Sequence, residues 1–154
     1  ALDMLQAMNT GHEGSLSTAH ANSPRDLLSR LETMALMSDV ELPVSHVREQ
    51  IAGALDLIVH MSRTSEGARV VARVSAVEGL STGSVVLEDI FAWRRGPEPA
   101  FEATGTMPSV IQMLEERDER VDPRVFTART SPGGGSALNG ARAGSIRQLG
   151  TLVE

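Results

Sequence analysis

The chain opens with an apolar pattern of helical period. Leu2, Leu5 and Met8 are spaced three residues apart, so they would share one face of a short helix over residues 1–8. Gly11 follows as a candidate stop, because glycine readily adopts the left-handed conformation that ends many helices. The helix begins without a cap or an entry loop, so we expect the sequence to be part of a longer polypeptide.

Two further helices are predicted before residue 56. The first is expected to begin at Pro24, since Ser23 can cap it, proline suits the first helical position and Asp26 favours the free amides. Its apolar face continues to about residue 38. The second covers about residues 43–54, and four apolar residues share one side of it: Val44, Val47, Ile51 and Leu55.

Other segments have the patterns of strands. The small residues of 14–21 predict a short strand before the helix at Pro24. After residue 56 the sequence predicts an antiparallel meander of three strands, one face of which is partly exposed to solvent. The predicted strands are 57–61, 69–77 and 85–93, with turns at 64–67 and 81–83.

The last part of the chain divides into a predicted helix and a tail. An apolar stripe around Ile111 predicts a helix over about residues 108–120. From residue 130 onward the chain is Gly, Ser, Ala and Arg without periodicity, which is typical of disorder. We therefore expect one folded unit over residues 1–128 and a disordered tail over 129–154.

Composition narrows the class of protein. The 154 residues are 41% hydrophobic, which is enough for a buried core. The net charge of −6 argues against a general binder of nucleic acid or anionic membranes, and the absence of cysteine excludes thiol chemistry. Because the chain has neither a long apolar run nor a secretory signal, a soluble intracellular protein is the expectation.

All 14 basic residues are arginine, and the sequence contains no lysine. A Schiff-base enzyme is therefore excluded. A complete phosphate-binding loop, G-x-x-x-x-G-K-[ST], is excluded as well, because its lysine supplies a compact cation to the β and γ phosphates. The chain alone cannot cradle a nucleotide in the usual way.

The densest group of chemically versatile residues lies between the first helix and Pro24. It contains His12 and His20, two glycines and several hydroxyls, which can approach and hydrogen-bond phosphate oxygens. A strand that ends just before a helix is also where ligands bind in open α/β sheets. Another interpretation fits the same residues: Gly11 caps the helix, His12 is a loop residue and His20 is a hydrogen-bonded residue at a strand end.

Zinc and serine-hydrolase chemistry are disfavoured by spacing. The two histidines are arranged as H-x7-H rather than H-E-x-x-H. Glu13 directly follows His12, so its side chain would point away from a metal that His12 bound. The sequence has no G-x-S-x-G elbow, and its glycine run at 133–135 belongs to the low-complexity tail.

Residues 1–24 resemble the histidine-box region of the type II/type IV secretion ATPases, most of all the CpaF-like motor of tight-adherence (Flp) pili. The similarity is specific through His60 and looser beyond, and it extends to about residue 128. The further matching segments are 25–34, 42–43, 48–52, 54–60, 88–91 and 122–126, with Gly105 and Pro108.

The resemblance implies an α/β fold, namely the C-terminal half of a RecA-like P-loop NTPase domain with an antiparallel β-meander and a C-terminal helix. It implies part of a hexameric ATPase that powers pilus assembly or type II/IV secretion with ATP and Mg²⁺. Its partners would be copies of itself and inner-membrane platform proteins on the cytoplasmic side, and not nucleic acid. The Walker A and Walker B motifs would precede Ala1, so the isolated chain is expected to be inactive and to lack the Mg²⁺ ligands.

The same resemblance assigns the site residues. His20 would lie near the γ-phosphate and sense the state of the nucleotide, and His12 would support the same loop. For the two arginines of the set, a solvated or salt-bridged role on the helix surface is the simpler explanation. The residues expected near the nucleotide or its phosphates are Gly11, Glu13, Thr18, Arg25 and Arg30, and none is expected to bind a metal.

A function of a different class stays open. The chain could be a non-enzymatic protein-interaction module whose histidine loop is structural. A G-x-x-x-x-G-K-[ST] motif encoded upstream of Ala1 would favour the motor, and an initiator codon at or near Ala1 would favour the module.

Overall fold

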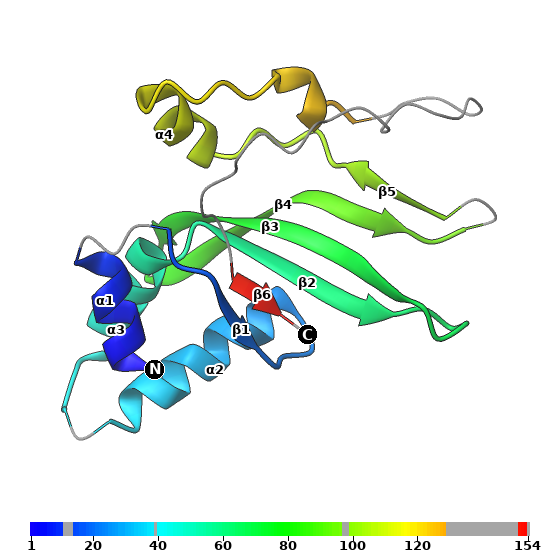
Figure 1. Ribbon diagram of the computed structural model, residues 1–154. Coiled ribbons are helices and arrows are strands. Elements are labelled where there is room, and N and C mark those ends of the chain that lie inside the picture. Colours follow the sequence, from blue (N-terminus) through cyan, green and yellow to red (C-terminus); the bar gives the residue numbers. More distant parts are fainter. Residues whose placement is uncertain (11–13, 39, 97–98, 129–150, 154) are drawn as a thin grey trace.

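The computed structural model describes residues 1–10, 14–38, 40–96, 99–128 and 151–153, and within them the chain forms a sheet of six strands with helices on both faces (Figure 1). The helices are α1 (Leu2–Asn9), α2 (Pro24–Leu36), α3 (Val44–Ala54), α4 (Val110–Glu116) and the 3-10 helix η1 (Pro123–Phe126). The strands are β1 (Ser17–Ala19), β2 (Leu57–Arg63), β3 (Arg69–Ser81), β4 (Ser84–Arg94), β5 (Ala100–Ala103) and β6 (Thr151–Val153).

The sheet combines a parallel part with an antiparallel part. Its strand order is β1-β6-β2-β3-β4-β5. Strands β1, β6 and β2 run parallel, whereas each strand from β2 to β5 is antiparallel to the next. The predicted three-stranded meander is therefore confirmed, and β5 extends it by a fourth strand that the sequence pattern did not predict.

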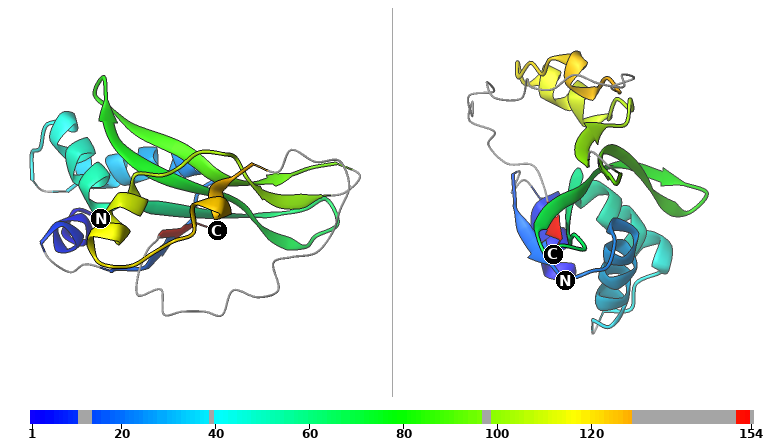
Figure 2. Two further views of the ribbon diagram at one scale, coloured as in Figure 1. Left: turned by 90° about the horizontal axis from the view of Figure 1, so that it is seen from above. Right: turned by 90° about the vertical axis from the view of Figure 1, so that its right-hand side faces the viewer.

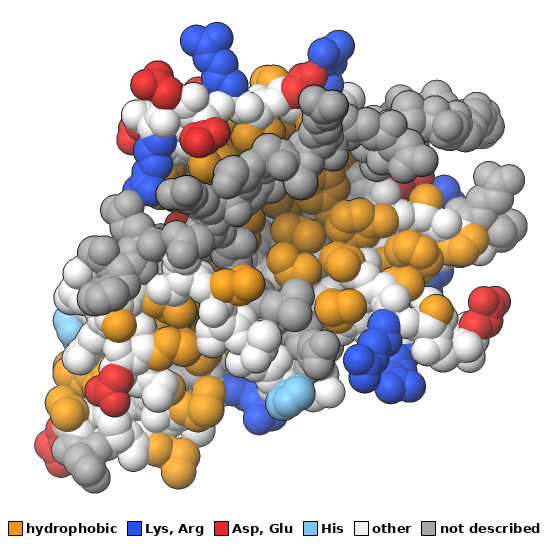
Figure 3. All heavy atoms as spheres, in the orientation of Figure 1, with side chains coloured by type: hydrophobic (Ala, Val, Ile, Leu, Met, Phe, Trp, Pro, Cys, Tyr) orange, Lys and Arg blue, Asp and Glu red, His pale blue; other side chains and the backbone are white. Residues whose placement is uncertain are grey.

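The sheet separates two helical layers (Figures 1 and 2). Helices α1, α2 and α3 pack on one face, and α4 with η1 lies over the other. Adjacent residues of β3 face opposite layers: Val77 belongs to the buried cluster beneath α1 to α3, and Ala76 to the cluster beneath α4. Figure 3 shows further hydrophobic side chains gathered over the strands of the meander.

The larger cluster is built from the apolar faces that the helical spacing predicted. Burial of each of its large aliphatic side chains contributes roughly 1.5–3 kcal/mol. Its most deeply buried members include Leu5, Leu27, Val47, Ile51 and Ile58.

Helix α2 begins where the sequence predicted. The Ser23 hydroxyl accepts a hydrogen bond from the Asp26 amide at 3.1 Å, and Pro24 occupies the first turn. In return, the Asp26 carboxylate accepts the Asn22 backbone amide at 2.8 Å. These contacts satisfy amides that the first turn leaves free, and they fix the path from β1 into α2.

Arg48 joins three elements. Its guanidinium, on α3, donates to both carboxylate oxygens of Glu32 on α2, at 2.8 and 3.0 Å, and to the Gly83 carbonyl at 2.8 Å. The hydrogen bond to Glu32 raises the pKa of Arg48 above its ordinary value. The Gly83 contact is possible because Thr82 and Gly83 form a two-residue turn with φ of 48° and 76°, which suits a tight hairpin between β3 and β4.

Three segments differ from the sequence pattern. The last helix ends at Glu116 rather than near residue 120, because Asp118 has φ of 61°, outside the helical region. The strand expected over 14–21 is only Ser17–Ala19. Within the segment expected to be a disordered tail, Thr151–Val153 form β6, and residues 129–150 and 154 lie outside the described residues.

We expect Ser23→Ala to lower the free energy of unfolding by about 1 kcal/mol, because the Asp26 amide loses its acceptor. Urea unfolding followed by circular dichroism measures this change. Ser29→Ala is the matched control, since Ser29 is exposed in the middle of the same helix, where alanine is favoured. Equal losses in both variants would show that the cap does not stabilise the helix start.

Candidate functional site

The link from β1 to α2 carries four of the predicted site residues. Thr18 lies in β1 and His20 follows that strand directly, and both are exposed. Arg25 is exposed in the first turn of α2, whereas Arg30 lies about 7.5 Å farther along the helix axis, given a rise of about 1.5 Å per residue. The remaining predicted residues, Gly11, His12 and Glu13, lie outside the described residues.

His20 therefore follows the carboxyl end of a parallel strand. In the register of the sheet, Ala19 is opposite Val153 of β6, which is opposite His60 of β2. Because adjacent strands are about 4.8 Å apart, the backbones of Ala19 and His60 are about 10 Å apart. Ligands of open α/β sheets bind at the carboxyl ends of parallel strands. The register thus brings a second histidine, His60, level with Ala19 and so within one residue of His20; His60 was not among the predicted site residues.

The imidazole of His60 has a buried nitrogen that lacks a hydrogen bond to the described residues. Its Nδ1 atom is buried and has no hydrogen-bond partner within the part of the chain that the structure describes. Leaving such an atom unpaired costs about 1–3 kcal/mol. Burial lowers the pKa of His60 below its ordinary value of 6.5, and the positive charge of Arg73, opposite it on β3, lowers the pKa further. The imidazole is therefore neutral at neutral pH and retains a ring nitrogen that can bond to another group.

Arg73 is itself held by a polar network across β3 and β4. Its Nη1 donates to Asp89 Oδ2 at 2.6 Å, and the Ser75 hydroxyl donates to Asp89 Oδ1 at 2.6 Å. Ser75 is fully buried. Because its hydroxyl proton is directed to Asp89, Ser75 positions a carboxylate and is not arranged as a nucleophile.

Neither a metal centre nor a membrane span is found in the described ranges. Their His, Asp and Glu side chains form no group of three or more that could hold a metal ion. In those ranges, every helix is too short or too polar to cross a bilayer.

In a comparison with known protein families, residues 1–88 match the family described as type II/IV secretion system protein. Two similar relatives are the conjugal transfer protein TrbB of Rhizobium radiobacter and the type IV secretion system protein PtlH of Bordetella pertussis. TrbB is 40% identical over 70 residues, which cover 46% of this chain and 20% of the relative. PtlH is 38% identical over 72 residues, which cover 45% of this chain and 21% of the relative. The chain thus spans about a fifth of the length of these relatives.

The environment of His60 predicts a pH dependence of stability. Because the pKa of His60 is lower in the folded state, the unfolded chain binds this proton first as the pH falls through about 6.5. The free energy of unfolding is therefore unaffected by this group above about pH 6.5. It decreases as the pH falls from there to the pKa of His60 in the folded state, and below that pKa the decrease is complete.

Free energies of unfolding at about pH 7.5 and about pH 5.5 measure this decrease, and His60→Gln should make it smaller. Ser29→Ala, which replaces an exposed residue of α2 that does not titrate, is the control and should leave the decrease unchanged. An unchanged pH dependence in His60→Gln would contradict the assignment.

Proposed function

Because the chain belongs to the type II/IV secretion system protein family, we propose that it forms the C-terminal part of a RecA-like ATPase motor domain that powers conjugal transfer or type IV secretion. The observation that carries the proposal is the family match over residues 1–88, which includes the whole β1–α2 link and the exposed His20. The names of the two relatives favour conjugal transfer and type IV secretion over the tight-adherence pilus branch that the sequence analysis expected. Pilus assembly is the second candidate, supported by the resemblance of residues 1–24.

In this proposal, the nucleotide binds at the carboxyl end of the parallel strands, with its γ-phosphate beside His20. Exposure of His20 leaves its imidazole accessible to a ligand. The imidazole can hydrogen-bond the γ-phosphate before hydrolysis and loses that bond once phosphate leaves, so it reports the state of the nucleotide. The start of α2, four residues later, adds the positive end of a helix dipole to the same region.

The phosphate-binding loop of the motor would come from residues other than these 154, because the sequence has no lysine. A parallel strand between β1 and β2 would deliver such a loop between His20 and His60. In this structure the three residues of β6 lie at that position. Mg²⁺ would neutralise the charge of the β and γ phosphates, but the described side chains do not fit a Mg²⁺ site, so we place its ligands elsewhere.

The roles proposed for the other predicted site residues rest on different observations. Arg25 is exposed in the first turn of α2, next to the strand end, so it is the better placed of the two arginines for a phosphate. Arg30 lies farther from the strand end. Roles for Thr18, His12 and the neighbouring Gly11 and Glu13 are supported by the family resemblance of the link.

We propose that the complete motor is a hexamer that works with platform proteins at the cytoplasmic face of the inner membrane. The resemblance to secretion ATPases supports this assembly. An interaction module with a structural histidine loop is the contrasting possibility, and it predicts no effect of His20 on any nucleotide-dependent step.

In the longer polypeptide that carries the phosphate-binding loop, His20→Ala should lower kcat at least about tenfold and change the dissociation constant for ADP much less. The reason is that the proposed contact involves the γ-phosphate only. Steady-state ATPase assays and ADP titrations measure the two quantities. His46→Ala, which removes an exposed histidine on α3, is the control and should preserve both. An equal loss of ADP binding and turnover would mean that the substitution disrupts the fold.

The isolated 154-residue chain should bind ATP very weakly and should not hydrolyse it, because it supplies no phosphate-binding lysine. Isothermal titration calorimetry measures the affinity, and release of inorganic phosphate measures the turnover. Micromolar ATP affinity in the purified chain would contradict the proposed division of the site.

A further inference from the structure

A separate concentration of positive charge lies at the tip of the β2–β3 hairpin. Arg63 ends β2, Arg69 begins β3, and the two are directly opposed in the strand ladder. Residues 64–68 close the hairpin, with the Thr64 amide donating to the Ala68 carbonyl at 2.8 Å. Like charges directly opposite each other destabilise an antiparallel pair. Both side chains are exposed, so solvent screens part of this repulsion, and an anion between them would offset the rest.

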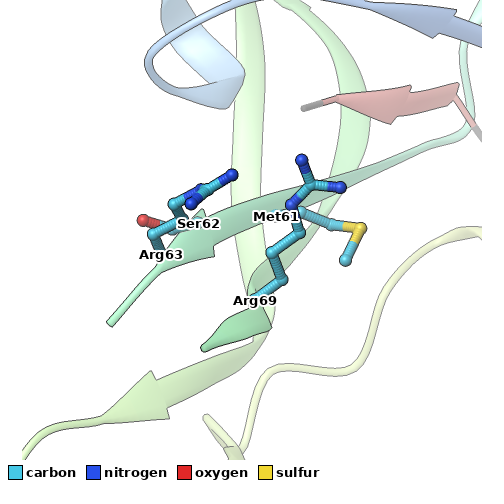
Figure 4. A pocket seen from close by; sticks show the side chains of 4 residues that line it. All are labelled: Met61, Ser62, Arg63 and Arg69. Atoms are coloured by element: carbon cyan, nitrogen blue, oxygen red, sulfur yellow. The ribbon is translucent and has the colours of Figure 1, made fainter. Parts of the chain in front are cut away.

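The two arginines line a hollow of about 200 Å³ together with Met61 and Ser62 (Figure 4). Figure 4 shows both guanidinium groups extending to the same side of the hairpin. This arrangement agrees with the ladder, because directly opposed residues share one face of a sheet. The hollow thus combines two cationic groups and one apolar wall.

No carboxylate within the described residues compensates either guanidinium. Arg73 shows the contrast, because it is paired with Asp89 at 2.6 Å. The described ion pairs include neither Arg63 nor Arg69. Between residues 60 and 73 the sequence has three arginines and one acidic residue, Glu66, although the whole chain carries a net charge of −6. The hairpin tip is therefore locally basic on an acidic protein.

We propose that this hollow binds a phosphate group. A single guanidinium already satisfies a carboxylate by a bidentate contact, whereas two guanidinium groups match the larger charge and the additional oxygens of a phosphate. Met61, two residues before Arg63 on β2, lies on the same face and covers one side of the hollow with apolar surface. The phosphate belongs either to a soluble phosphate compound or to the headgroup of an anionic phospholipid, since both present the same oxygens.

The site is distinct from the proposed nucleotide site. Arg63 lies three residues beyond His60 on β2, which places it about 10 Å farther along the strand. Phosphate binding at the hairpin tip therefore requires neither ATP nor His20, and either proposal can fail while the other holds.

The first test uses pyrophosphate as the probe and the full 154-residue chain. Two-dimensional ¹H–¹⁵N NMR should show shifts of the amides of residues 61–70, with weaker effects elsewhere. Arg63→Gln and Arg69→Gln should each weaken binding about tenfold, and the double variant should abolish it. Arg120→Gln removes an exposed arginine far from the hairpin in sequence and should bind like the unchanged chain. Circular dichroism verifies that each variant is folded.

The second test identifies the source of the phosphate. Co-sedimentation with vesicles of phosphatidylglycerol and phosphatidylcholine, compared with vesicles of phosphatidylcholine alone, should show binding that the double variant loses if a phospholipid headgroup is the ligand. Binding of pyrophosphate alone, with the same dependence on the two arginines, would assign a soluble phosphate. If the folded double variant retains binding to both probes, or if pyrophosphate shifts the amides of residues 20–26 in place of the hairpin tip, the proposal is wrong.

Discussion

Burial of one face of the sheet beneath α2 and α3 positions strand β2, which carries His60. Ile58 of β2 and Val77 of β3 share a buried cluster with Leu27 of α2 and Ile51 of α3. Ile58 precedes His60 by two residues, so the contact that buries Ile58 also sets how far the carboxyl end of β2 extends from the helices. Because interiors are closely packed, small displacements within this cluster would move the strand end.

The arginines divide into a structural group and an unpaired group. Arg48 ties two helices to the β3–β4 turn through Glu32 and Gly83, and Arg73 is held by Asp89. Arg63 and Arg69 lack such partners among the described residues and meet at the hairpin tip. Since every basic residue is an arginine, residue type does not separate the two roles, and only the neighbouring carboxylates do.

One strand connects the core with both proposed sites. β2 contributes Ile58 to the buried cluster, His60 to the level of the candidate nucleotide site and Arg63 to the hairpin tip. The parallel neighbour of β2, β6, ends opposite His60, and its antiparallel neighbour β3 is paired with it as far as Arg63. The change from parallel to antiparallel pairing therefore separates the two proposed anion sites along the same strand.

Local features of the fold follow from the sequence alone. Ser23, Pro24 and Asp26 determine the start of α2, and Thr82 with Gly83 determines a tight turn, because caps and turns depend on residues within a few positions of each other. The missing lysine likewise excludes a complete phosphate-binding loop without any knowledge of the structure. The existence of a short strand before α2 was also predicted, although it ends at Ala19 and so leaves His20 just beyond it.

Only the tertiary structure decided which distant residues meet. The short strand β6 lies between β1 and β2, and this pairing brings His60 level with Ala19, within one residue of His20. The ladder of β2 and β3 places Arg63 opposite Arg69, and the packing of β4 and β5 adds the fourth antiparallel strand. Apolar periodicity indicates that a segment is a strand, but strand partners and register depend on hydrogen bonds and packing between segments far apart in the chain.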